Sequence, residues 1–216
     1  RNEEWYNRGE GYEHCRPHAI LYNAVMDAIA RSGIPGAGQR VEKLLEEMED
    51  MYQAGADEAF KPSRRSLNAV MLAYRSEVDG GAKAEYILKR MEELSAVGVY
   101  DVMPDVVAFN TAIGAIVRSD DAVNAANRSQ ALLDRMDELY ASGHHLARPN
   151  GLTYAMCIEA WLKQQDEVGQ KMARQLLEKF FSMVDDNEDV FLETAPVLNV
   201  MRAYRQEEDG VREGGP

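Results

Sequence analysis

The sequence is poor in cysteine and has no long apolar run. Its 216 residues include two cysteines, Cys15 and Cys157, which lie far apart and form no CxxC pair. This excludes a disulfide-rich scaffold and a zinc ribbon, and it fits a reducing compartment. No apolar stretch approaches the length needed to cross a bilayer, so we expect no membrane-spanning helix. The first residues lack both the apolar core of a signal peptide and the Arg/Ser-rich composition of a targeting segment.

Basic residues and clustered metal ligands are also scarce. The chain has 24 Lys and Arg against 37 Asp and Glu, a formal net charge of −13 at pH 7, which repels polyanions at long range. His14, Cys15 and His18 form an HCxxH cluster without further ligands nearby. The scattered carboxylates form no acid/base pair. We therefore expect no metal, no cofactor and no catalysis by this segment.

What the sequence does contain is an internal repeat. A proline followed six residues later by asparagine, with an aromatic residue or leucine between them, occurs at Pro17–Asn23, Pro62–Asn68 and Pro104–Asn110. A related stretch, PNGLTYA, spans Pro149–Ala155, so the spacings are 45, 42 and 45 residues. A second apolar segment recurs in step, ending at Met48, Met91, Met136 and Phe180. Self-similarity at this period is typical of a solenoid, in which each unit covers the apolar face of the next.

Each repeat contains two segments with apolar residues at helical spacing. The pattern predicts first helices at 19–31, 64–76, 106–118 and 151–163, and second helices at 39–54, 82–97, 127–142 and 169–184. The proline before each first helix stops the preceding chain from continuing as helix. We therefore expect an all-α solenoid of helical hairpins without strands.

The repeat boundaries follow from the same alignment. Residues 1–18 are the end of a preceding repeat, 19–63, 64–105, 106–150 and 151–193 are four complete repeats, and 194–216 are the first helix of a further repeat and a tail. YNRG near the start matches later second-helix ends, and AYRQEEDG near the end matches AYRSEVDG at 73–80. We therefore expect the chain to be part of a longer array.

The motif PDVVAFNT, followed by ALLDRM and a glycine before the next proline, resembles the pentatricopeptide repeat family. The resemblance covers nearly the whole chain, although these repeats are longer than is usual in the family. The W-x-x-L-G pattern of tetratricopeptide repeats is absent. The resemblance implies a right-handed alpha-alpha superhelix whose first helices line a concave groove for single-stranded RNA, one base per repeat. It also implies organellar RNA processing, stability or translation, in a mitochondrion or chloroplast.

The resemblance further implies which residues read the RNA. In the family, the fifth residue of the first helix and the last residue of the repeat contact the base edge. The corresponding pairs are Asn23 with Ser63, Asn68 with Asp105, and Asn110 with Asn150. All three combinations are typical of pyrimidine preference, and Asn68 with Asp105 is the clearest case for uracil. The fourth repeat offers Ala155 with Glu193 and should be silent, because alanine has no hydrogen-bonding side chain.

One further position carries over from the family. Its second helical position flanks the bases, and here it holds Ile20, Arg65, Val107, Leu152 and, in the fifth repeat, Pro196. Arg65 departs from the apolar pattern, although a guanidinium plane can stack on a base. Cations recur at Arg31, Arg75, Arg118 and Lys163, where they could hold phosphates. In the fifth repeat the register places Leu198 rather than Asn199 at the reading position.

Other interpretations stay open at this point. The asparagines could be hydrogen-bonded between adjacent helices or cap helix N-termini, and the cations could be solvated helix ends. The first helices carry a net +4 and the second helices −2, so much of the acidity lies in the outer layer, loops and ends. An alternative function is therefore a scaffold that binds protein partners through its groove or its acidic convex face. Cys157 is expected to be a core thiol, and His144 and His145 to lie solvated in a loop.

Overall fold

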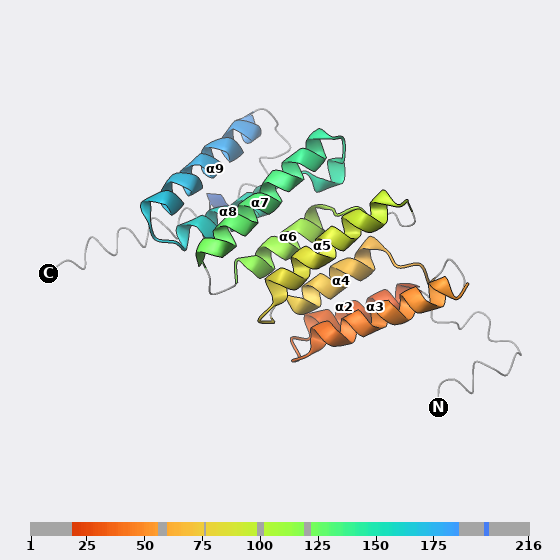
Figure 1. Ribbon diagram of the computed structural model, residues 1–216. Helices are drawn as coiled ribbons and strands as arrows, with labels where there is room; N and C mark the ends of the chain where they lie inside the picture. Colours follow the sequence, from red (N-terminus) through yellow and green to blue (C-terminus); the bar gives the residue numbers. More distant parts are fainter. Residues whose placement is uncertain are drawn as a thin grey trace, which may run out of the picture.

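The structure is a computed structural model that describes residues 19–55, 60–75, 77–98, 102–118, 122–185 and 197–198. Over these residues all regular structure is helical (Figure 1). The helices pair as α2 (Ala19–Arg31) with α3 (Ala37–Gln53), α4 (Arg64–Tyr74) with α5 (Gly80–Ala96), α6 (Val106–Ile116) with α7 (Ala122–Ala141), and α8 (Gly151–Leu162) with α9 (Glu167–Asp185). A short 3₁₀ helix, η3 (His145–Ala147), precedes α8. The prediction of an all-helical chain is confirmed for the described residues.

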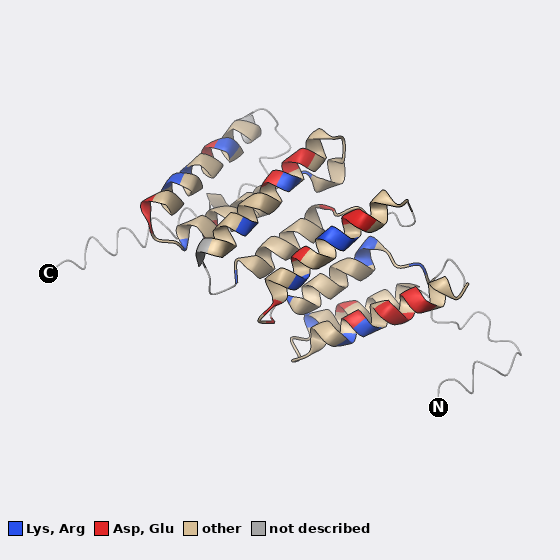
Figure 2. Ribbon diagram, in the orientation of Figure 1, with Lys and Arg blue, Asp and Glu red and all other residues tan. Residues whose placement is uncertain are grey.

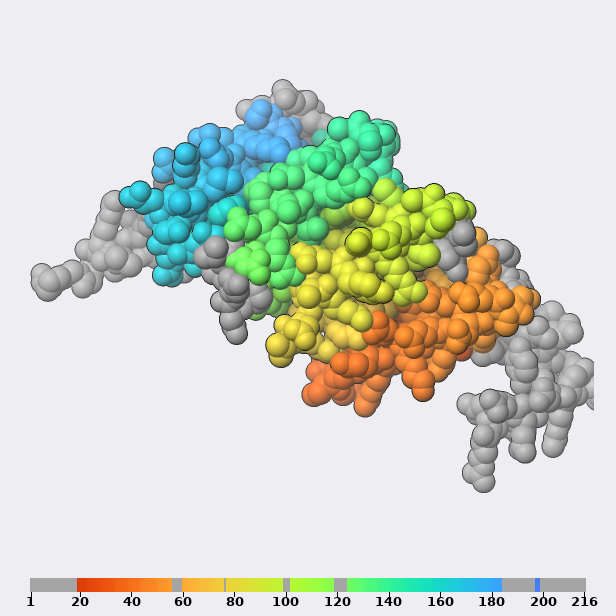
Figure 3. Space-filling view, viewed as in Figure 1, coloured from red at the N-terminus to blue at the C-terminus, as the bar shows by residue number. Residues whose placement is uncertain are grey.

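The hairpins follow one another in sequence order. Each first helix contacts the next first helix, α2 with α4, α4 with α6 and α6 with α8. Each second helix also packs on the first helix of the following repeat, α3 on α4, α5 on α6 and α7 on α8. Figure 3 shows the repeats in the same order along the surface of the molecule. The architecture is thus a stack of helix pairs in which each pair covers part of the next.

Local sequence signals set the helix ends. The Asp105 carboxylate accepts a hydrogen bond from the Ala108 amide at 2.9 Å, and the Asn150 side chain accepts one from the Thr153 amide at 3.1 Å, so both residues cap the first helices that follow them. Glycines with positive φ follow the second helices at Gly55, Gly98 and Gly143. The first helices thus begin at capping side chains, and the second helices end at glycines in the left-handed conformation.

The helix boundaries agree closely with prediction for the first helices but less well for the second helices. The second helices begin two to five residues earlier than predicted, and α7 begins at Ala122. Gly80, which the prediction placed before its helix, begins α5, and Gly169, which it placed at the helix start, lies within α9. A Cβ at either position would come within 2.3 Å of a backbone oxygen, that of Tyr74 or that of Trp161. These glycines therefore allow the two helices of a hairpin to approach closely at their turn.

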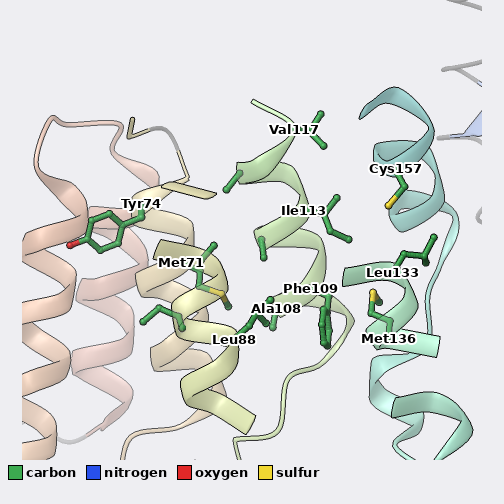
Figure 4. Packing of buried hydrophobic residues seen from close by; sticks show 14 of the residues in the cluster. Met71, Tyr74, Leu88, Ala108, Phe109, Ile113, Val117, Leu133, Met136 and Cys157 are labelled. Carbon is green, nitrogen blue, oxygen red and sulfur yellow. The ribbon is translucent and has the colours of Figure 1, made fainter. Parts of the chain in front are cut away.

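The core runs without interruption through the repeats (Figure 4). Met71 of α4, Leu88 of α5, Phe109 of α6 and Met136 of α7 are all buried. Cys157 of α8 is also fully buried, and its thiol donates to the Ser129 carbonyl at 3.6 Å. Burial raises the pKa of Cys157 to about 12, with nearby Asp134 and Asp137 adding to the effect. Cys157 is thus a core thiol, as expected.

Long charged side chains connect consecutive second helices. The pairs are Lys83 with Glu42 at 2.6 Å, Arg90 with Glu49 at 2.6 Å, Arg128 with Glu85 at 2.8 Å, Arg135 with Glu92 at 3.1 Å, and Lys179 with Asp137 at 2.5 Å. In every pair the carboxylate belongs to the earlier repeat and the cation to the later one. Figure 2 shows acidic and basic segments alternating along α5 and α7. These carboxylates are therefore partly neutralised by the neighbouring repeat.

Candidate nucleic-acid interface

A shallow groove of about 470 Å³ lies where α2, α4 and α6 meet. We call it the α4–α6 groove, and its lining residues are Asp27, Arg31, Arg64, Arg65, Asn68, Ala69, Leu72, Asp105, Val107 and Thr111. It brings together residues of all three kinds predicted from the sequence. Asn68 and Asp105 were predicted to read a base, Arg65 and Val107 to flank it, and Arg31 to hold a phosphate.

The Asn68–Asp105 pair has unused hydrogen-bonding capacity. One Asp105 carboxylate oxygen accepts the Ala108 amide, and the other lies 3.8 Å from Arg64. The Asn68 side-chain oxygen is buried and has no hydrogen-bond partner among the described residues. A buried carbonyl oxygen without a partner costs about 1–3 kcal/mol. The hydrogen-bonding capacity of the Asn68 amide oxygen is therefore not used by packing within the described residues.

The Asn110–Asn150 pair is joined directly. The Asn110 side-chain nitrogen donates to the Asn150 side-chain oxygen at 3.2 Å, and the Asn110 oxygen accepts from the Thr153 hydroxyl at 2.7 Å. The Thr153 hydroxyl also accepts from the Asn150 backbone amide at 3.1 Å. Asn110, the fifth residue of its helix, and Asn150, the last residue of its repeat, are thus in direct contact. Such contact is needed if the two side chains are to read one base together.

The Asn23–Ser63 pair is connected through Ser66. The Ser66 hydroxyl lies 2.7 Å from the Asn23 oxygen and 3.3 Å from the Ser63 hydroxyl. Asn23 is only 7% exposed, which leaves little of its side chain for a base. The alternative interpretation, hydrogen bonding between adjacent helices, is therefore confirmed for Asn23 and Asn110, whereas Asn68 has no such bond from its oxygen.

The predicted base-flanking residues are conspicuously exposed. Ile20 is 73% exposed, Val107 56% and Leu152 46%, although each lies near the start of a first helix whose other face is buried. Arg65 is also exposed, but its guanidinium is paired with Asp27, whose carboxylate oxygen lies 2.6 Å and 3.1 Å from two of its nitrogens. The apolar members of this set form a recurring exposed feature that packing within the chain does not use.

The predicted phosphate-binding cations fall into two groups. Arg31, Arg75 and Arg118 form no ion pair with another described residue. The pKa of the Arg75 guanidinium is lowered by burial and, to a smaller extent, by the positive charge of Arg118, so these two cations lie near one another. Lys163 differs because it donates to the Val117 carbonyl at 2.8 Å and pairs with Glu159 at 3.3 Å. All four lie at or just beyond the C-terminal ends of first helices, where the helix dipole also favours a cation.

The loop histidines differ from expectation. His144 is half-buried, with a ring nitrogen 3.0 Å from the Pro104 carbonyl oxygen, so the prediction that it is solvated is wrong. His145 is exposed and packs edge-on against Tyr140.

Of the predicted positions in the fourth and fifth repeats, Ala155 is buried and Leu198 is 38% exposed. The HCxxH cluster, Glu193, Pro196 and Asn199 lie outside the described residues.

Sequence reasoning missed the third residue of each first helix. Ser66 and Thr153 occupy this position in α4 and α8, and each bridges a predicted reading asparagine of the preceding repeat to its own N-cap residue. A hydroxyl three residues after a serine or asparagine N-cap is the signature of a capping box and could have marked them. In α6 the same position is Ala108.

Comparisons with known proteins add no assignment, because no family model and no curated protein matches the chain. Over the described residues, no group of three or more His, Cys, Asp or Glu side chains is placed to hold a metal ion. None of the helices described combines the length and apolar character required to cross a membrane.

Proposed function

We propose that this chain binds single-stranded RNA along its first helices, reading about one base per repeat and preferring pyrimidines in the first three complete repeats. In this proposal the hairpins wind into a right-handed superhelix of the pentatricopeptide repeat class. The protein then acts in organellar RNA processing, stability or translation, in a mitochondrion or a chloroplast, and catalyses no reaction through this segment.

The α4–α6 groove is the observation that supports the proposal most directly. It combines a carboxylate and an amide, Asp105 and Asn68, with an exposed apolar side chain, Val107, and a cation that forms no ion pair with a described residue, Arg31. A nucleotide presents the complementary set: polar base edges, a flat apolar base face and a negatively charged phosphate.

Local charge makes RNA binding compatible with the overall net charge of −13. The acidic side chains Glu42, Glu49, Glu85, Glu92 and Asp137 are engaged in ion pairs that connect the second helices. Arg31, Arg75 and Arg118 lie instead at the ends of the first helices. Because screening limits electrostatic reach to about 8 Å at physiological salt, phosphates on the first-helix side respond mainly to these nearby cations.

The second candidate function is a scaffold that binds protein partners through its acidic convex face. The exposed carboxylates Glu46, Glu47 and Asp50 on α3 favour it, because they are outside the ion pairs between repeats. A partner of this kind would carry a basic surface. RNA binding would use the first helices, whereas protein binding would use the second helices.

Fluorescence anisotropy with labelled RNA oligomers of equal length tests the proposal. Oligomers with uridine cores should bind more tightly than those with adenosine cores, at both of two salt concentrations. Asn68→Ala should cost about 1–3 kcal/mol with the uridine oligomer, by analogy with other paired base contacts. Arg118→Ala should weaken binding similarly for both sequences and reduce the salt slope by about 0.7 to 1 unit.

Two matched variants control for changes elsewhere. Gln175→Ala removes an exposed amide from α9, and Arg174→Ala removes an exposed positive charge from the same helix. Neither should change RNA binding specifically, although Arg174→Ala alters net charge as much as Arg118→Ala does. Equal binding of both oligomers, or no binding to either at low salt by the folded protein, contradicts the RNA proposal and favours the scaffold.

A further inference from the structure

In α4 and α8 the third residue of the helix lies against the asparagine at the fifth position of the preceding first helix. Ser66 of α4 donates its hydroxyl to the Asn23 oxygen, and Thr153 of α8 donates its hydroxyl to the Asn110 oxygen, both at 2.7 Å. The two contacts span the same 43 residues and therefore belong to the repeat geometry. In α6 the equivalent residue is Ala108, and the oxygen of the corresponding Asn68 is buried without a partner in the part of the chain that the structure describes.

The hydroxyl bond fixes which end of the amide points inward. The Asn150 oxygen accepts from the Thr153 amide and from the Asn110 nitrogen, which uses both of its lone pairs. The single hydroxyl proton of Thr153 is then best used by the Asn110 oxygen at 2.7 Å. Rotating the Asn110 amide by 180° would place its oxygen against the Asn150 oxygen, and two acceptors would face each other. Asn110 is therefore held in one orientation.

Asn68 lacks this restraint. Ala108 is completely buried and its side chain offers no donor, and the Asn68 oxygen has no hydrogen-bond partner among the described residues. Burying the amide nitrogen there instead would leave a donor unpaired, at a similar cost. The two orientations of the Asn68 amide are thus nearly balanced, whereas those of Asn110 are not.

We propose that the third residue of each first helix is a positioning residue that selects the orientation of the reading asparagine in the preceding repeat. This inference rests on the proposed RNA-reading function and adds a determinant of base choice to it. A hydroxyl at this position fixes where the amide presents its oxygen acceptor and where it presents its N–H donors. With alanine at this position, the bound base and neighbouring groups such as Asp105 decide the orientation of the amide.

The consequence concerns uracil and cytosine. These two bases have the same size but reverse one donor and one acceptor: uracil carries an oxygen acceptor and an N–H donor where cytosine carries an amino donor and a nitrogen acceptor. An amide that cannot rotate distinguishes them, whereas an amide that can rotate pairs with either. Thr153 should therefore contribute to discrimination between uracil and cytosine at Asn110 without touching the base itself.

The first test uses the protein alone. The side-chain amide signals of Asn110 and Asn68 are assigned by ¹⁵N NMR, and their hydrogen exchange is compared. We expect slow exchange for Asn110 in the native chain, faster exchange in Thr153→Val, and slower exchange of Asn68 in Ala108→Ser. Ser142→Ala is the control, because its hydroxyl bonds to the Leu139 carbonyl and to no asparagine. An Asn110 signal unchanged by Thr153→Val overturns the inference.

The second test separates positioning from helix capping, because Thr153 also accepts the Asn150 backbone amide. The affinity ratio for uridine-core and cytidine-core oligomers is measured for Thr153→Val, Asn110→Ala and the double variant. We expect Thr153→Val to change the ratio by about threefold to tenfold in the native background and not in the Asn110→Ala background. A loss of capping alone would have the same effect in both backgrounds, which overturns the inference.

The two tests distinguish this inference from the proposed function. If the amide signals behave as expected but the folded native chain binds no oligomer, or Asn110→Ala leaves binding unchanged, the RNA-reading function is wrong and with it the effect on base choice. If Asn110→Ala weakens binding while Thr153→Val leaves the ratio unchanged, RNA reading stands and the positioning role is wrong.

Discussion

A single kind of substitution, glycine to alanine, should have opposite effects at two helical positions. Gly80 begins α5, and a Cβ there would stand 2.3 Å from the Tyr74 backbone oxygen, about 1.1 Å closer than an ordinary contact of 3.4 Å. A backbone oxygen cannot rotate away as a side chain can, so the α4–α5 hairpin must open. Gly114 lies within α6, and a Cβ there would meet only the Met156 sulfur at 3.5 Å.

The magnitudes follow from this geometry. Gly114→Ala should stabilise the protein by about 0.5–1 kcal/mol, because alanine loses less backbone entropy in a helix and meets no clash. Gly80→Ala should destabilise it by about 1–3 kcal/mol, since overpacking exceeds any gain in helix propensity at the first turn. Neither glycine has a positive φ, so backbone conformation does not complicate the comparison.

Urea unfolding followed by circular dichroism gives the two changes in free energy. Stacked repeats need not unfold as one unit, so hydrogen exchange of α4 and α5 amides should accompany the measurement. The Gly80→Ala loss should appear first in these two helices. A neutral or stabilising Gly80→Ala would show that α5 can begin later at no cost, and it would refute the explanation given for its early start.

Three further outcomes are expected. In a Cys15→Ser background, Cys157 should resist thiol reagents at pH 8 until the protein unfolds, because its folded pKa is raised to about 12; fast labelling of the folded chain would contradict this. Because the folded pKa of Cys157 is raised, the unfolded thiol loses its proton above about pH 8.5 while the folded thiol keeps it. The free energy of unfolding should therefore fall as the pH rises above about 8.5, and this decline should be absent in Cys157→Ala. A double-mutant cycle on Arg135 and Glu92 should give a coupling of about 0.2–1 kcal/mol that diminishes at high salt, because both side chains are partly exposed; a salt-independent coupling would argue against an ion pair.

The sequence determined the elements and their order. Apolar spacing located all four first helices to within two residues, and the prolines marked where they begin, because these are local effects of backbone conformation and hydrogen bonding. The repeat period then indicated which helices are equivalent. The early start of α5 could not be predicted, because Gly80 is a stop signal in local terms and a close-contact residue only once α4 packs against it.

The candidate site was partly predictable for the same reason. The family resemblance, applied to the aligned repeats, implied Asn68, Asp105, Arg65 and Val107, and the recurring cations added Arg31. The structure places all five around one groove. Their role in binding stays a prediction. What alignment could not show is which of three similar asparagines has a partner, because that depends on a residue about 40 positions later in the chain.

Sequence alone thus determined that the chain is a stack of helical hairpins with polar, cationic and apolar positions recurring in register. Tertiary structure alone decided how those positions differ. Asn23 and Asn110 are held by hydroxyls of the next helix, while the Asn68 oxygen has no partner among the described residues, and the residue of α6 equivalent to those hydroxyl residues is Ala108. Local propensity fixes a helix residue by residue, but the hydrogen-bonding state of a side chain between two helices is fixed only by what the second helix brings to it.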